Sequence, residues 1–514
     1  MGSIGCSWLL SLQTLFYSYP ETLLALLSFL TFSLLRHRHT ILPTNWPVVG
    51  MLPTLVSEFP RLHDYVTDVL RLSGCTLLFR GPWLLRMDFL LTCDPSNVNH
   101  VFNLHPDNYP KGHEFADIFD VLGDSILIAD SDSWRFQRRL AHSVLGDRLF
   151  RSFVADTGLA KVRNGLLPFL DHMAANGHVV DLEDVFSRYS FDTACTTVLG
   201  VDFLALSVEF PTIPFAEAIQ EAEAALHLRH TMPSVCWKLL RWLNIGRERK
   251  LAMARVVIDK FIFQEVYKRK KQRQDLSAAD MLTVYMNWRS DSEDMRKCNY
   301  DQFLRDTTLS FMIAGKETVA TSLVWFFYMV CVNPNVEAKI VEELRALPSE
   351  KAGPYVVFDA DVLRRSVYLH AAFLETLRLF PPVPFEEKEA ANADVLPSGA
   401  KVSKGMRIIF SLYAMGRMEG VWGKDCMQFR PERWISKGGR VRHEPSYKFL
   451  AFNSGPRSCL GKDLALTQLK MVAAAMIYNF HVELAEGHAV VPANSIVLQL
   501  QNGLMGAVKR RSTI

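Results

Sequence analysis

The chain has 514 residues, of which 49% are hydrophobic, and this is enough to bury a large core. Its formal net charge of +3 excludes a strong overall field for nucleic acid. The nine cysteines are widely spaced and include no CxxC pair, which argues against a disulfide framework and against a cysteine-rich zinc site. This pattern favours a reducing compartment, with most thiols serving as small core residues.

The first 35 residues carry a single charge, Glu21, and residues 22–35 are mostly apolar. Basic residues at 36–39 follow directly, which predicts an uncleaved membrane anchor with the body of the protein in the cytosol. A cleaved signal peptide is the alternative, but it lacks a basic start and a small-residue cleavage site. We therefore predict an anchor over 1–35, a basic stop and stiff, extended Pro-rich hinge over 36–53, and one catalytic domain over 54–514.

The sequence of residues 54–514 predicts a mainly α fold with small β-sheets (α+β), without repeats or linkers. Apolar residues recur at helical spacing over 154–173, 181–199, 214–229, 250–273, 299–332, 335–347 and 368–379. Short β-like stretches cover 76–79, 90–93, 401–402, 408–410, 495–499 and 505–509. The basic run at 268–273 is expected to be a solvated helix end, with a membrane or partner role as the alternative.

Cys459 differs from the other cysteines in its local sequence. Residues 463–471 are helix-forming, so a helix is expected to begin at the cysteine, where free backbone N–H groups stabilise a thiolate. Gly455 permits a turn that a side chain would block, Gly461 permits close approach of a flat ligand, and Arg457 offers two donors to a carboxylate. The alternative is an inert buried cysteine.

The spacing Phe452-x-x-Gly455-x-Arg457-x-Cys459-x-Gly461 resembles the haem-binding loop of the cytochrome P450 superfamily. The resemblance implies the cytochrome P450 fold and haem b, with Cys459 as the axial thiolate ligand of the iron. It implies a monooxygenase, because thiolate ligation favours cleavage of the O–O bond.

The resemblance extends to two further residues on one helix and one in a later loop. Glu375 and Arg378 lie three residues apart, on one helix face, and Arg433 follows in a Pro-Glu-Arg-Trp segment. In the family such a set forms a buried structural cluster behind the haem loop. For Glu375 and Arg378 alone, a surface pair worth about 0.3–0.5 kcal/mol is the alternative.

The long helical segment 299–332 contains Ala314, Gly315, Glu317 and Thr318. Ala314 and Gly315 would leave room above a macrocycle, and the Thr318 hydroxyl can bond the carbonyl of Ala314 and open the helix locally. Glu317 beside Thr318 would deliver protons as a general acid, which makes these two the predicted catalytic residues. A core threonine beside a solvated glutamate is the alternative.

Trp134 and Arg138 lie four residues apart on a predicted helix. In the family these two donors meet a haem propionate, with Arg457 meeting the same or the other propionate. A surface stack of tryptophan on arginine is the alternative.

The resemblance covers nearly the whole chain and narrows to plant enzymes that oxidise long aliphatic chains, the fatty-acid and alkane hydroxylases of cutin and wax metabolism. The segments 109–112, 413–419, 422–426 and 455–462 indicate this clan, and 93–100 favours its mid-chain alkane hydroxylase subgroup. The subgroup also contains phenol-coupling enzymes of alkaloid biosynthesis. Family correspondence places substrate contacts at mostly apolar side chains, Phe115, Phe119, Phe311, Val383, Phe385 and Leu504, each of which could instead be plain core.

No flavin or nicotinamide motif follows the haem loop, so the expected electron donor is a membrane-bound NADPH–cytochrome P450 reductase at the endoplasmic reticulum. Basic residues near the haem loop, Arg135, Arg139, Lys448 and Lys462, could steer an acidic partner, with solvated surface charge as the alternative. The chain is expected to be a monomer. The function expected first is hydroxylation of a hydrophobic substrate, then phenol coupling, and last a non-oxygenase haem-thiolate rearrangase or haem sensor.

Overall fold

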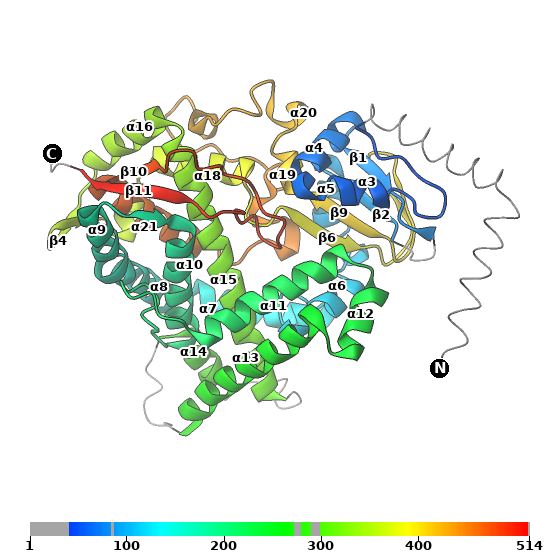
Figure 1. The fold of residues 1–514 in the computed structure, drawn as a ribbon, viewed down its shortest axis with the longest axis horizontal. Helices are drawn as coiled ribbons and strands as arrows, with labels where there is room; N and C mark the ends of the chain where they lie inside the picture. Colours follow the sequence, from blue (N-terminus) through cyan, green and yellow to red (C-terminus); the bar gives the residue numbers. More distant parts are fainter. Residues whose placement is uncertain (1–40, 84–86, 272–278, 289–298, 512–514) are drawn as a thin grey trace, which may run out of the picture.

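The computed structural model describes residues 41–83, 87–271, 279–288 and 299–511 (Figure 1). The protein is mainly helical with small sheets, as predicted. The long helix α15 (Tyr300–Cys331) passes through the middle of the molecule (Figure 1). On one side of it lie α8 (Arg148–Lys161), α9 (Leu167–Asn176) and α10 (Leu182–Ala194), and on the other lies a four-stranded sheet with α4 (Leu62–Leu72) and α5 (Pro95–Asn99). The predicted anchor over residues 1–35 lies outside the described residues.

Within the described ranges, no single helix has the length and apolar composition of a membrane span. Only α15 combined with α16 (Pro334–Arg345) would pass such a test, and the two are bent by 107°. The described part of the hinge differs from the extended chain expected for it. Trp46 and Gly50 exchange backbone hydrogen bonds of 2.9 Å, so residues 46–50 form a tight turn that satisfies its own amides.

The predicted helical segments match helices of the structure, although 154–173 and 181–199 each include a wider π-helical stretch, at η6 (Val162–Leu166) and η7 (Cys195–Leu199). The remaining α-helices are α3 (Leu52–Ser57), α4 (Leu62–Leu72), α5 (Pro95–Asn99), α6 (His113–Ile118), α7 (Ser131–Gly146), α8 (Arg148–Lys161), α9 (Leu167–Asn176), α10 (Leu182–Ala194), α11 (Pro214–Thr231), α12 (Ser234–Leu243), α13 (Gly246–Lys271), α14 (Met281–Trp288), α17 (Ala360–Leu363), α18 (Val367–Leu379), α19 (Leu412–Met415), α20 (Glu419–Trp422) and α21 (Lys462–Asn479).

The four-stranded sheet has the order β1-β2-β9-β6, in which only β2 and β9 are parallel. A three-stranded antiparallel sheet has the order β10-β11-β3, and two pairs of short strands complete the set. The strands are β1 (Thr76–Phe79), β2 (Phe89–Thr92), β3 (Val179–Asp181), β4 (Glu350–Ala352), β5 (Tyr355–Val357), β6 (Phe385–Glu389), β7 (Asp394–Val395), β8 (Lys401–Val402), β9 (Arg407–Ser411), β10 (Phe480–Leu484) and β11 (Met505–Arg510).

The strand predicted at 495–499 is wrong. The Gln499 amide bonds the carbonyl of Val497 at 2.8 Å, and the Leu498 amide bonds Pro382 at 2.8 Å. Because these backbone groups are satisfied by a tight turn and by a distant loop, the segment does not pair as a strand.

Stacked aromatic rings attach α15 to α18. Phe326 lies on Phe373 with ring centroids 3.9 Å apart, and Trp325 lies on Phe380 at 4.0 Å. The Trp325 indole also donates to the Leu498 carbonyl at 2.6 Å, which satisfies its one polar group. Each such buried ring stabilises the fold by roughly 1.5–3 kcal/mol, so this contact holds α15 firmly beside the site described below.

Candidate active site

A cavity of about 950 Å³ lies beside α15, with mostly apolar walls. It is large enough for a cofactor and a substrate together. The walls come from α7, α11, α15, the segment after α18, the loop before α21 and the C-terminal segment 494–499.

Cys459 belongs to the loop wall, and its exposed surface faces this cavity. The helix expected to begin at the cysteine begins instead at Lys462, because the chain turns once more through Gly461. The stabilising donors are still present. Burial raises the pKa of the Cys459 thiol, while the amides of Gly461 and Lys462 and the nearby charge of Arg138 favour the thiolate.

The two glycines of the loop have different roles. Gly455 has a φ of +66°, and a Cβ there would collide with the carbonyl oxygen of Phe102. Gly461 lines the cavity, and a Cβ there would lie 4.0 Å from the Cys459 sulfur, on the surface that a flat ligand would approach. Phe452 lines the same wall, and its carbonyl accepts the Cys459 amide at 2.7 Å, which fixes the direction of the sulfur.

Three predicted donors meet at one end of the cavity. Trp134 and Arg138 lie on α7, and the Arg457 guanidinium stacks 4.6 Å from the centre of the Trp134 ring. Arg457 also bonds Asp130 at 2.5 Å and the Ala129 carbonyl at 2.7 Å, while Arg138 reaches the Ser458 hydroxyl at 3.4 Å. Burial lowers the pKa of both arginines, yet each remains cationic at neutral pH.

On α15, the Thr318 hydroxyl donates to the Ala314 carbonyl at 2.7 Å, which confirms the contact predicted from the sequence. Ala314 is exposed to the cavity, and outside the local turn of α15 no atom of the described residues lies within 4 Å of a Cβ built on Gly315. This face of the helix therefore leaves open space opposite the loop that carries Cys459.

Glu317 lies at the cavity wall but is only 5% exposed, so it is not a freely solvated side chain. It forms an ion pair with the neighbouring Lys316, which is itself 1% exposed, and accepts from Gln499 at 3.4 Å. Lys316 was missed in the sequence, although it stands at helical spacing between the apolar Met312 and Val319 and therefore on a buried face.

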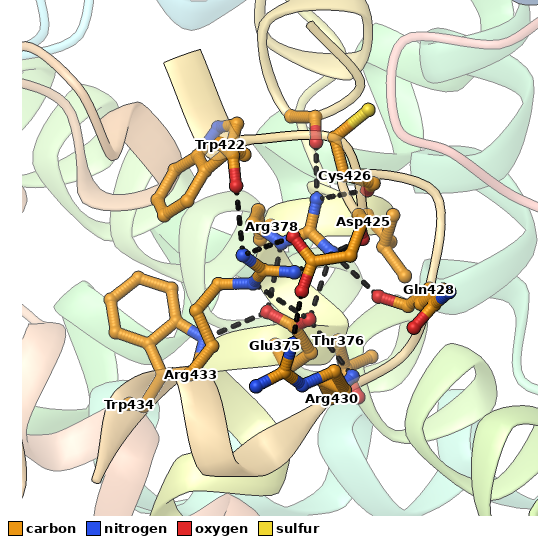
Figure 2. Close-up of polar contacts among 12 residues, drawn as sticks. Glu375, Thr376, Arg378, Trp422, Asp425, Cys426, Gln428, Arg430, Arg433 and Trp434 are labelled. Carbon is orange, nitrogen blue, oxygen red and sulfur yellow. Dashed lines mark hydrogen bonds and ion pairs between the residues drawn. The ribbon is translucent and has the colours of Figure 1, made fainter. Parts of the chain in front are cut away.

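The predicted Glu375–Arg378–Arg433 cluster is present, with Glu375 and Arg378 buried and Arg433 partly buried (Figure 2). Arg378 binds both Glu375 oxygens at 2.8 Å, and Arg433 approaches the same carboxylate at 3.3 Å. Sequence reasoning missed Trp434, whose indole donates to Glu375 at 2.9 Å, and Asp425, which accepts from Arg433 at 3.1 Å. Trp434 could have been found from the sequence, because it is the last residue of the Pro-Glu-Arg-Trp segment.

The cluster fixes the loop that leads toward Cys459. Arg378 donates to the carbonyls of Cys426 at 2.6 Å and Gln428 at 3.0 Å, and Arg433 donates to Trp422 at 2.9 Å (Figure 2). Two arginines therefore hold a segment that has little secondary structure of its own.

The family comparison agrees with this geometry, since the model described as "Cytochrome P450" matches residues 41–505. The chain belongs to the cytochrome P450 family. It is 44% identical to noroxomaritidine synthase 2 of Narcissus pseudonarcissus, over 96% of this chain and 97% of that one. It is 41% identical to alkane hydroxylase MAH1 of Arabidopsis thaliana, over 91% and 93%.

Among solved structures, the haem domain of cytochrome P450DA is similar, with a TM-score of 0.76 over 91% of this chain and 97% of that one. At 19% identity this likeness shows the fold alone. As a cytochrome P450, this protein is a monooxygenase that uses haem with a cysteine thiolate ligand and electrons from NADPH through a reductase.

The residues present fit a haem. The one cysteine on the described cavity wall is Cys459, and the opposite wall at Ala314 and Gly315 is open. Arg138 and Arg457 place two cations at one end, where an anionic edge of the macrocycle would be neutralised. A donor set of one thiolate, two arginines and the Trp134 indole matches the chemistry of a propionate-bearing iron macrocycle.

Four of the six predicted substrate residues, Phe115, Phe119, Phe311 and Val383, line the cavity. Phe385 lies on β6 outside the wall and stacks on His63, with ring centroids 5.4 Å apart. Leu504 is fully buried in the main core, with its amide bonded to Asp181 at 2.9 Å. The C-terminal chain instead contributes the wall segment 494–499, because the turn at Val497 moves the cavity contact upstream of β11.

Proposed function

We propose that this cytochrome P450 hydroxylates a long aliphatic substrate, an alkane or a fatty acid, in metabolism of the wax or cutin type. The cavity of about 950 Å³ carries this proposal, because its mostly apolar wall suits a hydrocarbon chain. The alkane hydroxylase among the relatives supports the same substrate class. The proposal includes a membrane anchor over residues 1–35, a site at the endoplasmic reticulum facing the cytosol, and a monomeric chain.

When bound, the haem supplies the oxygen chemistry, in which one atom of dioxygen enters a C–H bond and the other is reduced to water with two electrons from NADPH. The chain's own residues perform the surrounding tasks. Cys459 presents its sulfur to the iron, while Arg138, Arg457 and Trp134 orient the macrocycle by its anionic edge. The apolar wall at Phe115, Phe119, Phe311 and Val383 excludes water and holds the substrate.

Glu317 and Thr318 would move protons into the cavity. The Thr318 hydroxyl is held by Ala314 and faces the open space, and Glu317 is the nearest acid in sequence. A positioned acid of this kind contributes about 10²–10⁴ to the rate of a step that needs a proton.

A second candidate is oxidative phenol coupling, which a different wall of the cavity favours. Gln220 and His227 on α11 present hydrogen-bonding groups to the cavity, and Asn494 and Gln499 do so from the C-terminal segment. Asn494 already donates to the Phe59 carbonyl and Gln499 to Glu317, so the groups that an alkane would leave without a cavity partner are those of Gln220 and His227, which a phenolic amine could bond. The relatives named noroxomaritidine synthase support this candidate.

The experiment that separates the two is a reconstitution with a plant NADPH–cytochrome P450 reductase, offered a long-chain alkane, a fatty acid or a diphenolic amine. The expected product carries one added oxygen atom, read by mass spectrometry. A product of the amine that has lost two hydrogen atoms and gained no oxygen would select phenol coupling. Turnover of none of the three, in protein with a normal thiolate spectrum, would overturn both candidates.

The thiolate assignment has its own test. In the reduced protein, carbon monoxide should give the red-shifted Soret band of thiolate ligation, and Cys459→Ala should abolish it. Cys236→Ala, at an exposed cysteine on α12, is the matched control and should keep the band. A normal band in Cys459→Ala would exclude Cys459 as the ligand.

A further inference from the structure

A third ionisable side chain, the half-buried Glu223, lies beside the Lys316–Glu317 pair. Glu223 extends from α11 to the cavity wall, and its carboxyl interacts with both Lys316 and Glu317. The set therefore contains two carboxyls and one ammonium, contributed by two helices that are far apart in sequence. With both carboxyls ionised its net charge would be −1 in a buried environment, which is unfavourable.

Glu223 also lacks a hydrogen bond that a buried carboxylate oxygen would need. Its Oε1 atom is buried and has no hydrogen-bond partner among the residues that the structure describes. Burial first, and then the neighbouring Glu317 carboxyl, raise the pKa of Glu223 to about 8, while Lys316 opposes that rise. A protonated Glu223 can donate to Glu317, and the whole cluster then becomes neutral.

We propose that Glu223 and Lys316 complete a proton-holding cluster with Glu317, in which the two carboxyls share one proton and release it toward Thr318. This inference rests on the proposed role of Glu317 and Thr318 in proton delivery. The proton leaves a carboxyl O–H for an acceptor in the cavity, and the resulting carboxylate stays paired with the Lys316 ammonium. Solvent then returns one proton to the cluster, so charge balances over each cycle.

Among the described residues, the other groups that interact with the cluster do not supply a second cation. Glu183 on α10 faces Glu317, and burial raises the pKa of Glu183 to about 7. Cys195 on η7 faces Lys316, and burial raises the pKa of that thiol well above its usual range, so the thiol is neutral. Gln499 contributes only a neutral amide. Lys316 is thus the cation that sets how many protons this cluster holds.

The first test is infrared spectroscopy of the haem-loaded, substrate-free protein. Wild type should show a carboxylic-acid C=O band that disappears as the pH is raised through about 8, the pKa of Glu223, and Glu223→Gln should lack it. Glu221→Gln is the matched control, since Glu221 lies on the same helix but pairs at the surface with Arg247 and Lys250. A band that persists in Glu223→Gln would overturn the proposal, and Glu183→Gln identifies any band from Glu183.

The second test measures how much hydrogen peroxide is released per NADPH consumed during turnover of any substrate that the enzyme accepts. Glu223→Gln should release several-fold more hydrogen peroxide per NADPH than wild type, with its thiolate band retained. Glu223→Asp should partly restore the wild-type ratio. A merely structural Glu223 would change stability but leave peroxide release and its pH dependence unaltered, and that result would overturn the proposal. Because the infrared test needs no turnover, its result is independent of the substrate assignment.

Discussion

Two of the ionic clusters in the described part of the chain differ in how completely their charges are paired. In the Glu375 cluster, the carboxylates of Glu375 and Asp425 face Arg378, Arg433 and, at the more exposed edge, Arg430, and each Glu375 oxygen accepts at least two hydrogen bonds (Figure 2). In the Glu223 cluster, two carboxyls share one lysine, and one carboxyl oxygen has no partner among the described residues. The first arrangement suits a structural lock, and the second suits a group that must gain and lose a proton.

The largest effect is expected from Glu375→Gln. Loss of the carboxylate leaves Arg378 buried beside Arg433 without its counter-charge, which should lower the free energy of unfolding by about 3–5 kcal/mol. Urea unfolding followed by circular dichroism measures this. A loss below about 1 kcal/mol would mean that the cluster is not a lock.

Lys316→Met should have a smaller effect that depends on pH. The two carboxyls of the cluster can compensate for the missing positive charge by taking up protons. The free energy of unfolding should therefore fall by about 1–3 kcal/mol. Such protons are held in the folded state and released on unfolding above the usual carboxyl range, so stability must fall as the pH rises. Unfolding at pH 5 and pH 8 should show the greater loss at pH 8, and equal losses would contradict the comparison.

Glu223→Gln isolates the carboxyl that carries the shared proton. The pKa of Glu223 rises from 4.5 to about 8 on folding, so wild type loses stability as the pH rises through that interval. The glutamine variant lacks this loss and should gain relative to wild type between pH 5 and pH 8. Glu221→Gln is the control, because Lys250 holds the pKa of Glu221 below its usual range. The difference in unfolding free energy between this variant and wild type should therefore stay constant from pH 5 to pH 8.

The smallest effect is expected at the exposed edge of the Glu375 cluster. Lys339 pairs with Glu432 at 2.6 Å, but both side chains are about half exposed. Lys339→Met should therefore change the free energy of unfolding by at most about 1 kcal/mol. A loss as large as that of Glu375→Gln would show that burial does not set the strength of these pairs.

Local sequence was sufficient for several parts of the site. The Thr318–Ala314 bond needs only a hydroxyl four residues after a carbonyl on a helix, and it is present at 2.7 Å. Gly455 was predicted as a turn residue, and its φ of +66° confirms this. The position of Glu375 and Arg378 on one helix face was equally local.

Tertiary structure decided the features that depend on segments far apart in the chain. Lys316 is next to Glu317 in sequence, but Glu223 on α11 and Gln499 reach Glu317 from distant segments, and no local pattern brings Glu223 to Lys316. The wall expected at Leu504 comes from 494–499, because one tight turn displaces the whole segment.

The sequence by itself determined the family, the thiolate loop and the helix that faces it, since each depends on residue types at short fixed spacings. Packing determined which charges are buried and which are paired, because desolvation and Coulomb energy depend on neighbours from other helices. The same residue type is therefore a lock at Glu375 and, in our proposal, a proton carrier at Glu223.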